Sequence, residues 1–240
     1  MELTPSKMAK FLKKTLNFSL EIVFPKECVG CGQEKTWFCE ECSSKIIFIK
    51  SPTCPECSHL TNEGEYCPRH KKGKKLKGVY IAAYYKEGAL REAIHAFKYE
   101  FIKELAKPLG QILSQALCEK IIDEETILMP MALHPRRERQ RGFNQAKLIA
   151  QEVSRICGLE ISEGLRRVRH TKRQVDLNDR QRAQNVADAF AWNSPNKLHG
   201  KKVLLIDDVM TTGATLNEAA KALKTEAHAK EVWGLVLAKG

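Results

Sequence analysis

The sequence lacks several features that define large functional classes. No apolar run approaches the roughly 20 residues that a membrane-spanning helix requires, so we expect no transmembrane segment. Residues 1–24 offer neither a long uninterrupted apolar core nor a clear small-residue cleavage site, so they do not resemble a secretory signal peptide. The GxxxxGK[ST] loop of P-loop nucleotide hydrolases is absent as well. These absences predict a cytoplasmic protein outside the P-loop class.

Residues 1–24 instead mix basic and apolar side chains in a pattern that predicts an amphipathic helix. Such a helix packs on its own protein or lies on a membrane surface. We favour packing on the protein, with a peripheral position at the inner membrane surface as the alternative. The lysines are Lys7, Lys10, Lys13 and Lys14, and the apolar residues are Phe11, Leu12, Leu16, Phe18, Leu20, Ile22, Val23 and Phe24.

The chain carries a formal charge of +11 over 240 residues. That length accommodates one α/β domain and a small additional module. The excess of positive charge favours anionic partners, which include small phosphates and nucleic acid. The charge alone does not distinguish between them.

Nine cysteines would suit a disulfide framework in a secreted protein, but here their spacing favours metal. Two residues between paired ligands let one tight turn present both side chains to Zn²⁺, and four filled positions make a site structural. The spacing predicts two zinc sites, although it does not exclude interleaved pairing of the knuckles. Cys118 and Cys157 lie on helical patterns and are expected in the core. Site one comprises Cys28, Cys31, Cys39 and Cys42, and site two comprises Cys54, Cys57, Cys67 and His70.

A basic cluster from Arg69 to Lys77 follows the second set of ligands. It fits a solvated linker and a nucleic-acid contact equally well. We therefore expect three segments: the amphipathic helix over 1–24, a double zinc-ribbon module over 25–72 and a larger domain over 78–240.

The larger domain is organised around the stretch from Val203 to Thr215. Its four leading apolar residues predict a buried parallel strand that ends at two carboxylates, Asp207 and Asp208. These can hold ribose hydroxyls or Mg²⁺-bound water. A helical pattern follows, and the N–H groups and dipole at a helix N-terminus favour an anion. The stretch predicts a phosphate cradle with a loop of Thr211, Thr212, Gly213, Ala214 and Thr215.

Residues 126–133 predict a second buried strand, which an arginine-rich loop follows. In open α/β sheets, ligands bind at the carboxyl ends of strands. Guanidinium groups stay charged and bind phosphate oxygens bidentately, so we favour a phosphate-binding loop over a solvated basic loop or an RNA-binding patch. The loop begins at His134 and carries Arg136, Arg137, Arg139 and Arg141 before a helix over 146–156.

Residues 166–185 are polar and charged without a steady period. Within a domain this pattern is typical of a functional lid. A basic flap over a phosphorylated ligand fits it, and so does a groove for single-stranded nucleic acid, although aromatic residues for base stacking are lacking. The remaining elements are strands over 79–85 and 232–237, a helix over 89–98 and a helix over 105–122 interrupted by Pro108. Arg91, Lys98 and the neighbouring Tyr99 are candidates to face a ligand, with solvent exposure as the default.

The string IDDVMTTGAT at 206–215 resembles the phosphoribosyl-pyrophosphate (PRPP) motif of type I phosphoribosyltransferases. With the other motifs, it makes the chain resemble the ComF family of competence-associated phosphoribosyltransferase-like proteins from about Cys28 to the C-terminus. One departure is Ala132, where similar proteins usually have proline. The other motifs are the CxxC knuckles, Tyr85-x₂-Gly88-x₂-Arg91, Lys98-Tyr99, LHPRR…RGFNQ at 133–145, Arg169-x-Thr171-x₂-Gln174 and Arg182-x₂-Asn185.

The resemblance implies an α/β, type I phosphoribosyltransferase fold, in which helices flank a mostly parallel sheet, joined to a small N-terminal zinc-ribbon module. It implies that Asp207 and Asp208 hold the ribose hydroxyls and Mg²⁺, that residues 211–215 bind the 5′-phosphate, and that the loop after Leu133 binds pyrophosphate. The flap would be formed by Arg169, Thr171 and Gln174.

The resemblance also implies cytoplasmic assistance to natural DNA uptake, or to recombination of incoming single strands, with an unsettled acceptor. Competence helicases and recombination proteins are the candidate protein partners.

The first functional hypothesis is a Mg²⁺- and PRPP-binding transferase. Displacement at the ribose C1′ would release pyrophosphate, whose charge Arg136 and Arg137 would stabilise in a closed site that excludes water. No clear general base is present, because His134 and His170 are candidates only through their positions in loops. Met1 and Glu2 offer no N-terminal cysteine, which disfavours a glutamine-dependent amidotransferase.

The second hypothesis is an adaptor that binds single-stranded nucleic acid on the same fold without turnover. It would use the zinc module and the basic clusters at 69–77 and 166–173 on phosphodiester backbones.

Overall fold

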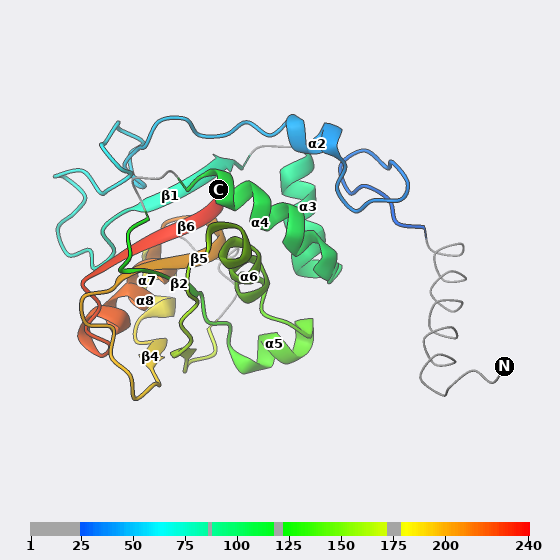
Figure 1. Ribbon diagram of the computed structural model, residues 1–240. Helices are drawn as coiled ribbons and strands as arrows, with labels where there is room; N and C mark the ends of the chain where they lie inside the picture. The colour runs from blue at the N-terminus through cyan, green and yellow to red at the C-terminus, as the bar shows by residue number, and fades with distance from the viewer. Residues whose placement is uncertain (1–24, 86–87, 118–121, 172–178) are drawn as a thin grey trace, which may run out of the picture.

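A computed structural model describes residues 25–85, 88–117, 122–171 and 179–240 (Figure 1). The predicted helix over 1–24, Cys118 and Gln174 lie outside these ranges. Among the helices that the structure describes, none combines the length and the apolar composition needed to cross a bilayer.

The described chain folds from short helices and strands in α/β alternation after an N-terminal segment with little regular structure. Their order places each long strand next to a helix that can cover it. The elements are α2 (Glu40–Ser44), β1 (Val79–Tyr84), α3 (Ala89–Tyr99), the 3₁₀ turn η1 (Lys103–Leu105), α4 (Ala106–Gln115), β2 (Thr126–Pro130), α5 (Pro135–Arg141), α6 (Gln145–Cys157), β3 (Leu165–Arg167), α7 (Asp179–Val186), β4 (Phe190–Trp192), β5 (Lys202–Met210), α8 (Ala214–Thr225) and β6 (Glu231–Lys239).

The central sheet has the strand order β1-β6-β5-β2, and every neighbouring pair is parallel. A parallel bridge between Leu128 and Ile161 continues the sheet beyond β2. Strands β3 and β4 form a separate antiparallel pair. This mostly parallel sheet flanked by helices confirms the predicted fold class.

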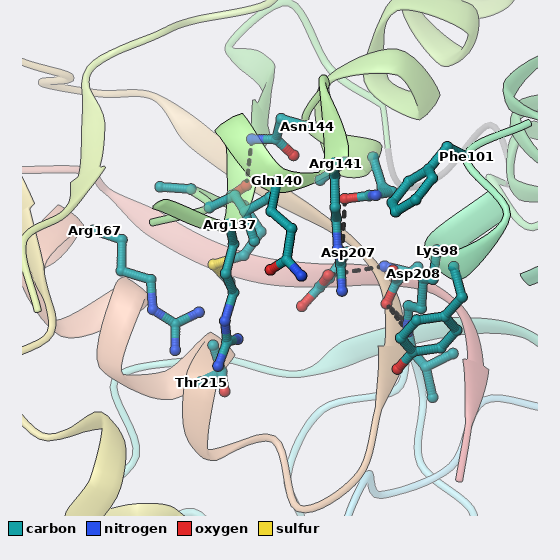
Figure 2. Close-up of a pocket in the computed structure, with 17 residues that line it drawn as sticks. Lys98, Phe101, Arg137, Gln140, Arg141, Asn144, Arg167, Asp207, Asp208 and Thr215 are labelled. Carbon is teal, nitrogen blue, oxygen red and sulfur yellow. Dashed lines mark hydrogen bonds and ion pairs between the residues drawn. The ribbon is translucent and has the colours of Figure 1, made fainter. Parts of the chain in front are cut away.

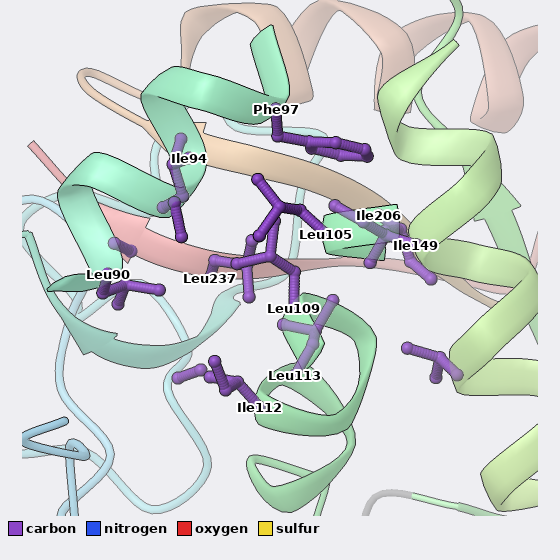
Figure 3. Close-up of a cluster of buried hydrophobic side chains, with 14 of the residues drawn as sticks. Leu90, Ile94, Phe97, Leu105, Leu109, Ile112, Leu113, Ile149, Ile206 and Leu237 are labelled. Carbon is purple, nitrogen blue, oxygen red and sulfur yellow. The ribbon is translucent and has the colours of Figure 1, made fainter. Parts of the chain in front are cut away.

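Both faces of the sheet are covered, so the strands are apolar on both sides. Helices α3, α4 and α6 lie over one face, and α7 and α8 lie on the other (Figure 1). Along β5 the side chains alternate: Leu204 and Ile206 join the core under α4 and α6, whereas Val203 and Leu205 join the core under α8. Figure 3 shows Ile206 of β5 and Ile149 of α6 in the first of these cores.

The carboxylates Asp207 and Asp208 do not end β5, contrary to the prediction, because the strand continues to Met210. Backbone pairing with β6 supports this extension, with Asp207 opposite Val236 and Met210 opposite Lys239. Ladder hydrogen bonds use main-chain groups, so polar side chains do not interrupt them. The acidic pair is therefore held on a strand rather than on a turn.

The arginine-rich segment after β2 is also different from the prediction, since it forms helix α5 rather than a loop. The His134 side chain caps its N-terminus, Pro135 occupies the first turn, and Gly142 ends it in the left-handed conformation with φ of 76°. Proline at the start and glycine at the end of a helix are strong boundary signals. The helix fixes the direction of each arginine.

The predicted long helix over 105–122 is shorter in the structure, where η1 precedes α4 and α4 ends at Gln115. Pro108 lies in the first turn of α4, where its missing N–H would have no intrahelical partner in any case. It is accommodated without a break.

The cysteine-rich segment packs along β1, the outer strand of the sheet. Phe48 forms an antiparallel bridge with Ala83, and Glu65 forms one with Gly78. A further main-chain bond runs from the Ile49 N–H to the Ala82 carbonyl at 2.9 Å. An exposed strand edge invites aggregation, and this segment covers it.

Two isoleucines of α6 test where the core lies. Ile149 has an exposed fraction of 0%, whereas Ile156 has one of 43%. We expect Ile149→Ala to lower the free energy of unfolding by about 2–5 kcal/mol, because truncation leaves a cavity. Ile156→Ala, seven positions along the same helix, should cost less than about 1 kcal/mol. Denaturant unfolding of both variants measures the difference, and equal losses would contradict this assignment.

Candidate functional site

The cysteine-rich segment gathers two four-ligand clusters, whose ligand atoms lie within 4.8 Å of one another. Each cluster combines two ligand pairs that follow one another in the sequence, so the ligand pairs are not interleaved between the two clusters. Sulfur atoms 3.6 Å apart in Cys31 and Cys39, and 3.8 Å apart in Cys57 and Cys67, match the separation of about 3.8 Å that tetrahedral Zn–S bonds require. The clusters are Cys28, Cys31, Cys39 and Cys42, and Cys54, Cys57, Cys67 and His70.

The first cysteine of each cluster is prepared to bind metal as a thiolate. Burial raises the pKa of Cys28, but main-chain N–H groups directed at its sulfur outweigh this and bring the pKa down to about 6. Cys54 has the same balance and also a pKa of about 6. Thiolate sulfur is a preferred zinc ligand. Four protein ligands leave no open position, which is consistent with two structural zinc ions.

The carboxylates Asp207 and Asp208 lie side by side near the carboxyl end of β5. The Asp207 Oδ1 accepts the Asp208 N–H at 2.9 Å, and the Asp208 Oδ1 accepts the Val209 N–H at 2.6 Å. Asp208 is buried, with an exposed fraction of 7%. Lys98, from the last turn of α3, places its Nζ 2.8 Å from the Asp208 Oδ1. The positive charge of Lys98 thus balances part of the negative charge of the acidic pair.

These neighbours shift the proton affinity of the site. Burial, and then the charge of Asp208, raise the pKa of Asp207 to about 7, against the opposing effect of Lys98. Burial lowers the pKa of Lys98, but the charge of Asp208 outweighs burial, and the pKa of Lys98 is raised overall. An additional cation or a set of hydroxyl donors at this position would relieve the repulsion between the carboxylates.

Arginines from α5 face the acidic pair across a cavity of about 240 Å³. Arg137 and Arg141 line this cavity one helical turn apart, because residues four positions apart share a helix face. Arg136 and Arg139 are exposed and do not line it. Figure 2 shows Arg137 on one side of Asp207 and Lys98 on the other.

A third arginine, Arg167 of β3, enters the same cavity. Burial and the charge of Arg137 lower the pKa of Arg167 to about 10. Its Nη2 donates to the Thr171 hydroxyl at 2.5 Å, and the Thr171 carbonyl accepts from Arg137 at 2.8 Å. The buried Arg167 Nε has no hydrogen-bond partner within the part of the chain that the structure describes. Thr171, predicted to belong to a flap, therefore joins the two guanidinium groups.

Other residues predicted for the flap and the loop lie at the margin of this cavity. Arg169 is exposed and donates to the Ala187 carbonyl. His134 and His170 meet edge to face, with ring centroids 5.0 Å apart. Burial, followed by the charges of His170 and nearby arginines, lowers the pKa of His134. His134 lines a neighbouring hollow of about 670 Å³ rather than the cavity of the acidic pair.

The predicted phosphate loop leads directly into α8. Gly213, at φ of 74°, precedes the first turn of the helix, where a left-handed residue favours glycine. The Thr212 hydroxyl accepts the Ala214 N–H at 3.4 Å. Thr215 lines the cavity of the acidic pair, whereas Thr211, Thr212 and Ala214 line an adjoining hollow of about 490 Å³. The loop separates these two spaces.

Sequence reasoning missed several lining residues. Lys98 was a candidate to face a ligand with exposure as the default, and the tertiary position of α3 directs it inward. Arg167 lies in the predicted flap over 166–185, but that segment lacks a period, so nothing singled it out as a lining residue. Asn144 caps α6 and donates to the Met131 carbonyl at 3.1 Å, and its position before a helix could have identified it as a cap.

The site therefore presents cations, carboxylates and a helix N-terminus around one cavity. Such a set can bind a ligand that carries both phosphate and vicinal hydroxyl groups. Among the described residues that line it, none forms a nucleophile with its own base.

Two family models match the chain. One, described as a double zinc ribbon domain, matches residues 19–70, and the other, described as a phosphoribosyl transferase domain, matches residues 139–239.

Relatives match most of the chain. Competence protein F of Haemophilus influenzae is 30% identical over 231 residues, which cover 90% of this chain and 98% of that protein. The DNA utilization protein YhgH of Escherichia coli is 32% identical over 82% of this chain and 88% of its own length. Competence protein ComFC of Bacillus subtilis is 25% identical over 83% of this chain and 82% of its own length.

The raised pKa of Asp207, about 7, makes a prediction about stability. An aspartate has a pKa of about 3.9 in an unfolded chain, so the folded parent binds this proton more tightly. The stabilisation of the folded state by this bound proton is complete below about pH 3.9 and is lost as the pH rises through 7. We expect Asp207→Asn, which cannot ionise, to be more stable than the parent by about 1–3 kcal/mol at pH 8.

Unfolding in denaturant between pH 5 and 8 measures this effect, and the gain should grow over that range. Asp188→Asn is the control, and its stability relative to the parent should change in the opposite direction as the pH rises, because Lys221 lowers the pKa of Asp188. A variant Asp207→Asn no more stable than the parent at pH 8 would contradict the buried-charge assignment.

Proposed function

The chain belongs to the family of competence protein F and ComFC, and we propose that it is a Mg²⁺- and PRPP-binding phosphoribosyltransferase-like protein that assists natural competence. Competence proteins and a DNA utilization protein are among its relatives. That kinship supports a role in the uptake or processing of incoming single-stranded DNA, which we place in the cytoplasm as part of the proposal.

One observation carries the proposal: the acidic pair of β5 and three arginines line a single cavity that Thr215, the last residue of the predicted phosphate loop, also lines. Asp207, Asp208 and Thr215 line the cavity together with the guanidinium groups of Arg137, Arg141 and Arg167. PRPP carries ribose hydroxyls, a 5′-phosphate and a pyrophosphate, and the carboxylates, the loop threonine and the guanidinium groups are chemically suited to these three kinds of group.

The roles of the residues follow from their chemistry. Asp207 and Asp208 accept hydrogen bonds from the ribose hydroxyls, and the loop 211–215 holds the 5′-phosphate on its main-chain N–H groups. Arg137 and Arg141 bind pyrophosphate oxygens. Mg²⁺, when bound with PRPP, would neutralise part of the pyrophosphate charge.

Turnover would be a displacement at C1′. The acceptor forms a bond to C1′, the bond from C1′ to the pyrophosphate oxygen breaks, and the electron pair leaves with pyrophosphate. Arg137 and Arg141 stabilise the charge that develops there as fixed donors. The proton that the acceptor loses passes to the departing pyrophosphate or to water, since no side chain that the structure describes in this cavity is placed as its base.

Some predicted roles have less support. Arg136 is exposed and His134 lies in the neighbouring hollow, so their roles at pyrophosphate rest on the sequence motif. A flap that includes Arg169 and Thr171 could close over the cavity, and Arg167 connects it to the site through Thr171. Gln174 is outside the described residues.

A single-stranded nucleic-acid adaptor is the second candidate, and one surface favours it. A hollow of about 670 Å³ beside the second zinc cluster is lined by six lysines from two parts of the chain. Such a groove attracts a phosphodiester backbone. The binding need not exclude PRPP, which could act as an effector. The lysines are Lys71, Lys74, Lys75, Lys77, Lys224 and Lys230.

Two arginines of α5 test the ligand site. Arg137 lines the cavity and Arg139 is exposed. We expect Arg137→Ala to weaken binding of PRPP with Mg²⁺ by about 10- to 100-fold, the range for loss of charged hydrogen bonds. Arg139→Ala, the matched control, should bind within about twofold of the parent. Calorimetric titration reports affinity, and pyrophosphate release with candidate acceptors reports turnover. Equal affinities for the two variants would refute the proposed position of pyrophosphate.

The adaptor function has a separate test. If the lysine groove binds single strands, affinity for an oligodeoxythymidine should fall steeply with salt. It should be unchanged in Asp207→Asn and reduced in the double variant Lys71→Ala/Lys75→Ala. Fluorescence anisotropy at several salt concentrations measures this. Weak, variant-independent binding would remove the adaptor hypothesis.

A further inference from the structure

We propose that the second zinc cluster positions the phosphate loop, through Tyr66 and Asn217, so that zinc occupancy and loop order are coupled. The cluster of Cys54, Cys57, Cys67 and His70 would then be part of the phosphate site rather than a separate module. Coupling to a bound ligand rests on the proposed function, whereas coupling to loop order does not.

The first contact is made at the start of α8. Tyr66 precedes the zinc ligand Cys67 in sequence and is buried, with an exposed fraction of 4%. Its hydroxyl lies only 3.0 Å from the position that a Cβ would take on Gly213. The loop glycine therefore packs against a residue that the zinc cluster holds in place.

The second contact is a pair of hydrogen bonds over a long sequence separation. The Asn217 Oδ1, in the first turn of α8, accepts the Lys75 N–H at 2.8 Å and the Leu76 N–H at 3.2 Å. Both donors follow His70, the last ligand of the cluster. One amide side chain thus ties the helix that carries the phosphate loop to the segment that leaves the cluster.

The hollow behind the loop is shared by the two parts. It is lined by Thr211, Thr212 and Ala214 of the loop and by Pro55 and Glu56. Those last two residues are the two that separate the ligands Cys54 and Cys57. The turn that presents two thiolates to zinc therefore forms a wall of the space behind the phosphate loop.

The hydrophobic contacts agree with these bonds. Cys54, Cys67 and Tyr66 belong to the same buried cluster as Leu216 and Ala220 of α8. By contrast, the first zinc cluster packs on the other core: Cys28, Cys39 and Cys42 are buried with residues of α3. Each cluster therefore supports a different element around the candidate site.

The physical consequence is a thermodynamic linkage between zinc binding and the order of the phosphate loop. Zinc fixes a segment that has almost no secondary structure of its own, and structural zinc ions supply folding free energy directly. Removing the ion releases Tyr66 and the donors to Asn217, so the loop loses two of its supports. If a ligand binds only the ordered loop, ligand and zinc must strengthen each other's binding by the same factor.

Two matched cysteine variants test the coupling in the full chain. Cys31 and Cys57 are both exposed ligands, one in each cluster. Native mass spectrometry first establishes that Cys31→Ser and Cys57→Ser each retain one zinc ion. Hydrogen exchange of the amides at 211–218, without any ligand, is then compared with that of the parent. We expect about tenfold faster exchange or more in Cys57→Ser only.

Asn217→Ala tests the same connection without touching the zinc ligands. It should accelerate exchange at 211–218 while both zinc ions are retained, and Asn196→Ala, an exposed asparagine, should not. The expected loss of affinity for ribose 5-phosphate is about 5- to 10-fold, because two hydrogen bonds to one acceptor are lost.

The outcomes of these exchange measurements can be distinguished from a failure of the proposed function. Unchanged exchange at 211–218 in both Cys57→Ser and Asn217→Ala would overturn the coupling, whatever ligand binds. Equal acceleration by Cys31→Ser would also overturn it, because the effect would then be general destabilisation. Accelerated exchange in a protein that binds neither ribose 5-phosphate nor PRPP would support the coupling and refute the ligand assignment.

Discussion

The charge balance of two adjacent carboxylates near the carboxyl end of a buried strand is the constraint on which the site depends. β5 pairs with β2 up to Ile206 and with β6 through the acidic pair, where Asp207 lies opposite Val236. Burial and mutual repulsion make both charges costly unless cations are close. Lys98 supplies one at 2.8 Å. The arginines of α5 and β3 line the same cavity, so four cationic side chains accompany two carboxylates there. A ligand that carries both hydroxyl and phosphate groups suits this arrangement.

The cysteine-rich segment has a structural part in that arrangement. It covers the edge strand β1 with few backbone ladder bonds, and it has little regular secondary structure. Zinc ligation replaces the hydrophobic core that so short a segment cannot build. Its first cluster packs against α3, the helix whose last turn carries Lys98, and its second packs against α8, the helix that begins at the proposed phosphate loop. The module therefore packs against two of the helices that contribute residues to the cavity.

Much of this could be predicted from the sequence, because local signals agree with the fold. The apolar run of β5, the CxxC spacing and the glycine before α8 favoured the strand, the metal ligands and the helix start that the structure has, although the pairing of the knuckles was left open, and the predicted fold class is confirmed. Long-range effects were not readable. Nothing local indicates that Lys98 turns inward or that Arg167 is buried, since both depend on how α3 and the β3–β4 pair dock. Helix α5 was not predicted although Pro135 and Gly142 are boundary signals, because its sequence PRRERQR has no apolar residues from which a helical period could be read.

The most direct test of the phosphoribosyl site is calorimetric titration of PRPP with Mg²⁺ on the zinc-loaded parent and on Asp207→Asn/Asp208→Asn. The double variant keeps the shape of both side chains and removes both charges, so it isolates the acidic pair. The account predicts binding in the micromolar range for the parent, about −8 kcal/mol, and no detectable binding for the variant. Absence of binding by a folded, zinc-loaded parent would contradict it.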